Sequence, residues 1–180
     1  MTNLQNLTKY NAPVQLIAVL LCSAGNNYLI AEDSILYFFM PGITWAFALL
    51  LPILKYSSDK RFALLLFPMA ITVLWFLGLA FGATFGAQLL EASPLFAFPI
   101  VGAIGAWCTY FLYGKLVLDV VEPKNAFICT GLGYVSFMLF MLAHRTGSYK
   151  VVLEDMFVYW QPLVGFGCMI AHLHRMNRLQ

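Results

Sequence analysis

Charged residues are scarce in this chain. Of its 180 residues, 10 are Lys or Arg and 8 are Asp or Glu, so 10% are charged, against about a quarter in a typical soluble domain. Hydrophobic residues make up 62% of the sequence, and the mean hydropathy is +0.81. A chain of 20.2 kDa has too much surface to hide this many apolar side chains in one water-soluble core. The composition therefore excludes an independent soluble domain and a disordered tail.

The chain also lacks the basic surplus that nucleic-acid binding requires. Its formal net charge is only +2, whereas proteins that neutralise a phosphate backbone present clustered Lys and Arg. We therefore expect no nucleic-acid partner. The solvent that suits such an apolar surface is lipid, and the first expected partner of the chain is the lipid bilayer.

Six apolar stretches are long enough, or nearly so, to cross a bilayer as helices, which takes about 20 mostly apolar residues. They cover residues 12–31, 35–54, 62–90, 95–121, 126–143 and 151–171. Lipid offers no partner to backbone N–H and C=O groups, so these spans should be helices rather than open strands. The sequence thus predicts an all-α integral membrane bundle of six transmembrane helices, forming a single transmembrane domain over residues 1–180. A five-span bundle is the alternative, because Glu154 and Asp155 lie in the first turn of the sixth stretch.

The first stretch has some features of a cleaved signal peptide. Lys9 precedes the apolar run 14–21, which is followed by the small residues Ser23 and Ala24. Apolar character resumes at residues 28–31, however. We therefore expect the first stretch to remain as a span.

The distribution of basic residues predicts the orientation of the bundle. With six spans, eight basic and three acidic residues fall on the side of the termini, and two basic and five acidic residues fall on the other side. Basic residues are retained preferentially on the cytoplasmic side. We expect both termini to be cytoplasmic, in a multi-pass protein of the inner (plasma) membrane. With five spans, Arg175 and Arg178 would lie outside, which weakens the asymmetry.

Small residues at helical spacing predict where spans pack closely. Hydrophobicity cannot drive one lipid-covered helix against another, so small residues that allow close approach must do so. The candidate helix-packing residues are Gly78, Gly82 and Gly86 in the third stretch and Gly102, Gly105 and Ala106 in the fourth. This pattern predicts a tight hairpin of the third and fourth spans. A pore-lining or sliding helix is the functional alternative for the same stripe.

The motifs of catalytic and metal sites are missing. No Asp, Glu, Lys, Arg or His falls in the middle of any expected span, which argues against a proton relay or an ion-coupled pump. The sequence has no G-x-S-x-G, H-E-x-x-H or C-x-x-C motif. His172 and His174 point about 200° apart on a helix, so they cannot share a metal ion. We therefore expect no catalytic activity, no cofactor and no metal ion.

Uncharged polar residues gather instead at the predicted outer half of the bundle. Together with two acidic residues, they form a candidate vestibule for a small polar or cationic solute: Asn26, Asn27, Gln88, Gln161, Glu154 and Asp155. The alternative is that the amides form hydrogen bonds between helices, worth about 0.6–2 kcal/mol each, and that the acids lie outside for reasons of topology.

Two functions remain compatible with these patterns. The first is a non-catalytic membrane subunit of a larger membrane assembly, of the secretion, conjugation or respiratory type, packed through small-residue helix faces. Its expected partners are other membrane protein subunits or further copies of the chain. The alternative is a small-solute channel, permease or substrate-binding protein that uses the polar vestibule.

Overall fold

Every element that the structure describes is a helix. The computed structural model describes residues 2–29, 36–51, 65–78, 94–143 and 156–178. The α-helices among them are α1 (Thr2–Leu29), α2 (Leu36–Leu50), the segment Leu65–Gly78, α4 (Pro94–Tyr113), α5 (Pro123–Ala143) and α7 (Gln161–Arg178). Two π-helical turns, η1 (Gly114–Leu118) and η2 (Met156–Trp160), continue α4 and precede α7. The all-α prediction is confirmed for these residues.

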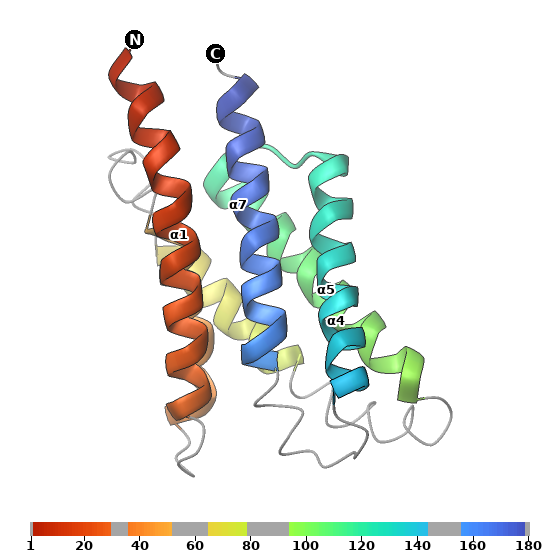
Figure 1. The fold of residues 1–180 in the computed structure, drawn as a ribbon. Coiled ribbons are helices and arrows are strands. Elements are labelled where there is room, and N and C mark those ends of the chain that lie inside the picture. The colour runs from red at the N-terminus through yellow and green to blue at the C-terminus, as the bar shows by residue number, and fades with distance from the viewer. Residues whose placement is uncertain (1, 30–35, 52–64, 79–93, 144–155, 179–180) are drawn as a thin grey trace.

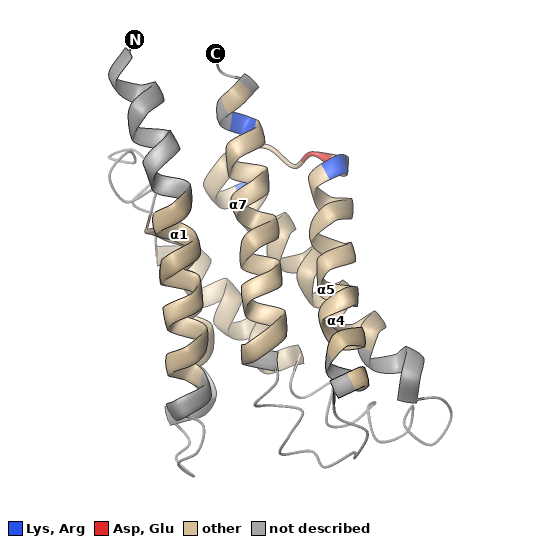
Figure 2. Cartoon of the chain, in the orientation of Figure 1, with Lys and Arg blue, Asp and Glu red and all other residues tan. Residues whose placement is uncertain are grey.

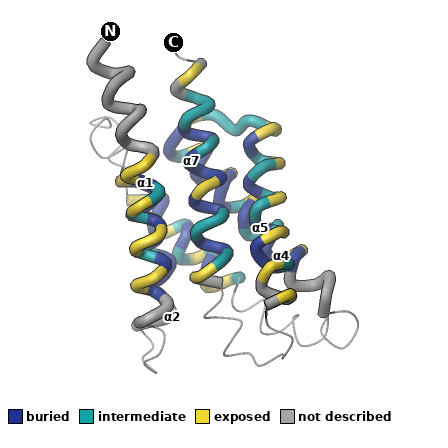
Figure 3. Tube along the Cα trace, viewed as in Figure 1, coloured by how far each residue is buried: buried dark blue, intermediate teal, exposed yellow. Residues whose placement is uncertain are grey.

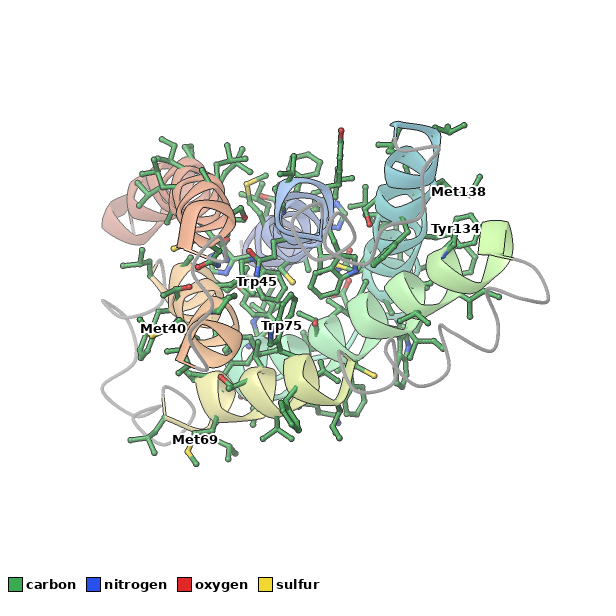
Figure 4. The ribbon with its side chains drawn as sticks, turned by 90° about the horizontal axis from the view of Figure 1, so that it is seen from below. Met40, Trp45, Met69, Trp75, Tyr134 and Met138 are labelled. Atoms are coloured by element: carbon green, nitrogen blue, oxygen red, sulfur yellow. The ribbon has the colours of Figure 1, made fainter. Side chains whose placement is uncertain are left out.

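The helices form a bundle whose two termini emerge at the same end (Figure 1). α1 packs against α2 and α7, and α5 packs against α4 and α7. α7 therefore lies between α1 and α5, while α2, the segment Leu65–Gly78 and α4 lie on the other side of the bundle, as Figures 1 and 4 both show. The described helices follow the expected spans closely at residues 94–118 and 123–143, whereas α1 begins ten residues before the expected span 12–31.

One described helix is long and apolar enough to cross a membrane, Pro99–Leu118. Three further apolar helices are shorter: Pro13–Asn26, Met40–Leu50 and Leu65–Gly78. Parts of the expected spans 35–54, 62–90 and 151–171 lie outside the described residues. The structure thus gives weak support for a membrane protein, and the number of spans stays a prediction.

Among the residues that the structure describes, the charged side chains lie at the end of the bundle where the termini emerge (Figure 2). The charged side chains that the structure describes are Lys115, Asp119, Glu122, Lys124 and Arg175. They lie in η1, in the α4–α5 connection, in the first turn of α5 and near the end of α7. The other described side chains of the bundle carry no Asp, Glu, Lys or Arg.

Many of the exposed residues of the described helices are large and apolar. Figure 3 marks the exposed positions in yellow along these helices. On α5, Phe127 is 84% exposed and Leu142 is 71% exposed, and on α1 Leu21 is 68% exposed. Leu65, Met69 and Val73 follow one another at four-residue spacing on one exposed helix face. Figure 4 shows Met40 and Met69 at the periphery, whereas Trp45 and Trp75 lie toward the middle of the bundle.

The closest helix contact in the described residues joins α4 to α5. A Cβ atom on Gly102 would overlap the Phe137 ring, and a Cβ atom on Gly133 would lie 2.5 Å from the Gly102 carbonyl oxygen and overlap Ala106. Both glycines are therefore required for the two backbones to approach this closely. Gly165 of α7 allows a similarly close approach to Val19 of α1.

The partner of α4 at this contact differs from the one that the sequence suggested. We expected Gly102 and Ala106 to pack against Gly78, Gly82 and Gly86, but the structure places them against Gly133. A Cβ atom on Gly78 would meet nothing within 4 Å in the described part of the chain. Gly82 and Gly86 lie outside the described residues, and their packing stays a prediction. The spacing of small residues identifies a groove but not the helix that fills it.

Two glycines on α5 should respond in opposite directions to the same substitution. Gly133→Ala forces a methyl group against Gly102 and should destabilise the protein by about 1–3 kcal/mol. Gly131→Ala meets nothing within 4 Å and should stabilise it by about 0.5–1 kcal/mol, because alanine favours the helix. Chemical unfolding of both variants in detergent micelles measures the difference. Equal effects of the two substitutions would contradict the close α4–α5 contact.

Candidate functional site

Three polar side chains meet in the interior at the end of the bundle opposite the termini. Asn26 of α1 and Gln161 of α7 are almost fully buried, and the Asn26 Nδ2 donates to Gln161 Oε1 at 3.2 Å. The Thr44 hydroxyl of α2 donates to Asn26 Oδ1 at 2.9 Å. The cluster thus joins three helices through neutral groups, and it brings together residues that are 135 positions apart in the chain.

Two prolines shape the backbone around this cluster. The Pro41 carbonyl oxygen accepts from Asn26 Nδ2 at 3.4 Å and lies at the same distance from the Thr44 hydroxyl oxygen. Pro162 follows directly after Gln161 and has no N–H to continue an α-helical hydrogen-bond ladder. The π-helical turn η2 occupies the five residues before Gln161, and π turns are rare features that are frequent at functional sites. We attribute this break in the helix to Pro162.

Two tryptophans form an aromatic wall beside the amides. The rings of Trp45 and Trp160 lie 5.3 Å apart between centroids and are tilted by 45°. The Trp160 Nε1–H donates to the Gly102 carbonyl oxygen at 3.0 Å, which ties η2 to α4. Gly105, one turn further along α4, lets the Trp160 ring lie against the helix, since a Cβ atom there would be 3.2 Å from it. This glycine, expected to face a neighbouring span, therefore contacts an aromatic ring.

A second polar cluster lies deeper along the same interior. Gln15 of α1 is fully buried, and its Nε2 donates to the Leu49 carbonyl oxygen at 2.9 Å and to the Tyr113 hydroxyl at 3.0 Å. Tyr113 of α4 is also fully buried and makes an edge contact with Phe67, with 5.9 Å between ring centroids. Gln15 thus links α1, α2 and α4 as Asn26 links α1, α2 and α7.

A series of hydrogen bonds connects α4, α5 and α7 at the end of the bundle where the termini emerge. The Glu122 backbone N–H donates to the Tyr110 hydroxyl at 2.9 Å, and the Asn125 Nδ2 donates to Glu122 Oε2 at 3.1 Å. The Asn125 Oδ1 lies 2.7 Å from His174 Nδ1, and because an amide oxygen only accepts, the proton lies on the histidine nitrogen. This series ties the start of α5 to the end of α7.

The connection from α4 to α5 is a tight turn in the same region. Asp119 adopts a left-handed conformation with φ of 58°, which aspartate tolerates better than most residues. The Val120 N–H donates to the Gly114 carbonyl oxygen at 2.9 Å, which ends η1. Arg175 of α7 lies 3.9 Å from Asp119, an exposed ion pair that contributes little to stability.

One histidine of α7 is buried just beyond the expected span 151–171. Burial lowers the pKa of His172, and the positive charge of Arg175 lowers it further. The imidazole of His172 is therefore neutral at pH 7. No group of His, Cys, Asp and Glu within the described residues is arranged to hold a metal ion.

The predicted vestibule is only partly visible in the described residues. Asn26 and Gln161 come together, but both are buried and bonded to each other. Gln88, Glu154 and Asp155 lie outside the described residues, as does the side chain of Asn27. Whether these groups surround the Asn26–Gln161 pair stays a prediction.

Sequence reasoning missed three of the five polar side chains in these two interior clusters, Gln15, Thr44 and Tyr113. Gln15 escaped notice because it stands close to the polar start of α1, and Thr44 because a threonine in an apolar helix usually bonds to its own backbone. Tyr113 gave no sign of a buried contact, because tyrosine is a residue type enriched at membrane interfaces. A helical projection of 12–31 could have found Gln15, since it lies eleven positions, or three turns, from Asn26 on the same face.

No protein-family model matches the chain, and no curated protein or solved structure is similar to it. The family is therefore not assigned.

The Asn26–Gln161 hydrogen bond should appear as an energetic coupling. In a double-mutant cycle with Asn26→Ala and Gln161→Ala, we expect a coupling of about 0.6–2 kcal/mol, the range of interhelical hydrogen bonds in membrane proteins. Chemical unfolding in detergent micelles measures each variant. As a control, Asn26→Ala should add independently to Ser136→Ala, because Ser136 bonds to Gly133 within α5. Simple additivity of Asn26→Ala and Gln161→Ala would refute the contact.

Proposed function

We propose that this chain is a multi-pass integral membrane protein of the inner membrane, with six spans and cytoplasmic termini, and that it is a non-catalytic subunit of a larger membrane assembly. The exposed apolar side chains on the described helices support the membrane setting, since a soluble surface rarely carries a large contiguous apolar area. The confinement of described charges to one end agrees with it.

The observation that carries the subunit role is a set of outward-facing glycines. Gly25 on α1 and Gly131 on α5 are exposed, and a Cβ atom on either would meet nothing within 4 Å. Glycine costs a helix about 0.5–1 kcal/mol relative to alanine, and these two make no close contact within the described chain. In membranes, small residues are enriched where helices of different subunits approach closely. Their partners are therefore helices of other subunits or of further copies.

A second function is supported by the buried amides. Asn26, Thr44 and Gln161 could bind a small polar solute at the end of the bundle opposite the termini. A channel, permease or substrate-binding protein would need such neutral groups in its interior. The two functions predict different results on purification. A subunit co-purifies with other polypeptides, whereas a permease is a monomer or homo-oligomer.

The proposed orientation makes a labelling prediction. Lys124→Cys should react with a membrane-impermeant maleimide only in inside-out vesicles, because the α4–α5 connection is cytoplasmic in a six-span bundle. Ser148→Cys, in the following connection, should react only in right-side-out vesicles or intact cells. The wild-type chain with its four native cysteines gives the background. Labelling of both variants from one side would contradict the alternating topology.

Purification from native membranes tests the subunit role. In mild detergent the wild-type chain should co-elute with other polypeptides at a constant ratio. Gly25→Leu and Gly131→Leu should lose these partners without lowering the thermal stability of the isolated chain, since neither side chain meets the bundle. Val135→Leu, at an exposed position of α5 that already carries a branched side chain, is the control and should retain them. A wild-type chain that elutes alone would contradict the proposal.

A further inference from the structure

Five buried polar atoms have no hydrogen-bond partner within the described part of the chain. They belong to side chains of α1, α2, α4 and α7: Gln15 Oε1, Trp45 Nε1, Thr109 Oγ1, Gln161 Nε2 and His172 Nδ1. Gln15, Thr109 and Gln161 are 0% exposed and Trp45 is 1% exposed. Native proteins pair nearly all of their buried polar atoms, so five such atoms in one interior require an explanation.

The five atoms are spread along the long axis of the bundle. Asn26 meets Gln161, Trp160 meets Gly102, and Gln15 meets Tyr113, which sets the relative depth of α1, α4 and α7. On each of these helices, eleven residues separate two levels of the bundle. The first level contains Asn26, Gly102 and Gln161, and the second contains Gln15, Tyr113 and His172. Eleven helical residues correspond to about 16 Å.

Thr109 lies between these two levels, because it is seven positions beyond Gly102 on α4. Trp45 lies at the level of Gly102, because its ring contacts that of Trp160. The atoms without partners are thus distributed from Gln161, through Trp45 and Thr109, to Gln15 and His172. They do not form a single cluster.

The chemistry along this axis is neutral and mixed. Gln161 Nε2 and Trp45 Nε1 are donors, Gln15 Oε1 is an acceptor, and the Thr109 hydroxyl can be either. Tyr113 accepts from Gln15 Nε2, so its own hydroxyl hydrogen can serve a further acceptor. None of the five side chains is charged at pH 7, because burial keeps His172 neutral.

We propose that the interior between α1, α2, α4 and α7 binds a file of small uncharged molecules that both donate and accept hydrogen bonds, held by Gln161, Trp45, Thr109, Gln15 and His172. Water has this chemistry, and so do small solutes such as glycerol and urea. The described groups are neutral and include donors as well as acceptors, which suits uncharged molecules that do both. The proposal deepens the second function, solute binding, and extends it from the end of the bundle into its interior.

Two tryptophans provide a matched test. The Trp160 Nε1–H is bonded to the Gly102 carbonyl oxygen, whereas the Trp45 Nε1–H has no protein partner in the described chain, although both rings are buried and touch. If the file is occupied, the Trp45 indole hydrogen exchanges with deuterated water at least about tenfold faster than that of Trp160. Exchange is followed on the ¹⁵N-labelled chain in micelles, with signals assigned by Trp→Phe variants. Exchange at Trp45 as slow as at Trp160 overturns the proposal.

Two threonines provide a second test, in which the direction of the change in thermal midpoint is informative. Thr109→Val removes a hydroxyl that the file would use, so it should lower the thermal midpoint by roughly 2–4 °C. A truly unpaired hydroxyl would give the opposite result, because its removal relieves a desolvation cost. Thr130→Val is the control, since the Thr130 hydroxyl bonds to the Ala126 carbonyl oxygen of its own helix. A midpoint that rises or stays unchanged for Thr109→Val overturns the proposal.

Permeability measurements identify the occupant. The full chain is reconstituted into vesicles of phosphatidylcholine and phosphatidylglycerol, and shrinkage is followed after a sucrose, glycerol or urea step. Faster water flux alone assigns water, and faster glycerol or urea flux assigns a small solute. Fast Trp45 exchange with unchanged flux assigns water held between closed ends. Co-purification tests the subunit role, whereas exchange and permeability test the file of bound molecules. One proposal can therefore fail without the other.

Discussion

The position of Gly102 is the constraint on which the interior depends. Its missing side chain lets α4 lie directly against Gly133 of α5, and its carbonyl oxygen receives the indole hydrogen of Trp160. Trp160 then lies against Trp45, and Gln161, the next residue, reaches Asn26. One small residue thus sets both the closest helix contact and the placement of the buried amides. A larger residue there would disturb both at once.

The second principle of the structure is the separation of charge from neutral polarity. The described charges lie at the end of the termini, where water can solvate them, while the interior uses amides, hydroxyls and indoles. In a medium without water, neutral groups can bond between helices at a modest desolvation cost, whereas ionised groups are expensive. The hydrogen-bonded chain from Tyr110 to His174 lies at the boundary between these two regions.

Several parts of this molecule could be predicted from its sequence. The long apolar stretches and short polar breaks predict helices at residues 94–118 and 123–143 within a few residues, because apolar length is a local property. The grouping of Asn26 with Gln161 follows from depth in an alternating bundle. The partner of Gly102 could not be predicted, because spacing describes one helix and close packing depends on two. Gln15 and Tyr113 meet although they are 98 positions apart in the chain, which no local pattern reveals.

The π-helical turn η2 has a consequence for how this chain can change over time. A π turn accommodates about one residue more than an α-helical turn of the same rise. Removing that residue would rotate everything before Gln161 by about 100° around the helix axis relative to α7. Trp160 would then leave the Gly102 carbonyl oxygen. Insertions and deletions in Met156–Trp160 should therefore be far less tolerated during evolution than exchanges of its side chains.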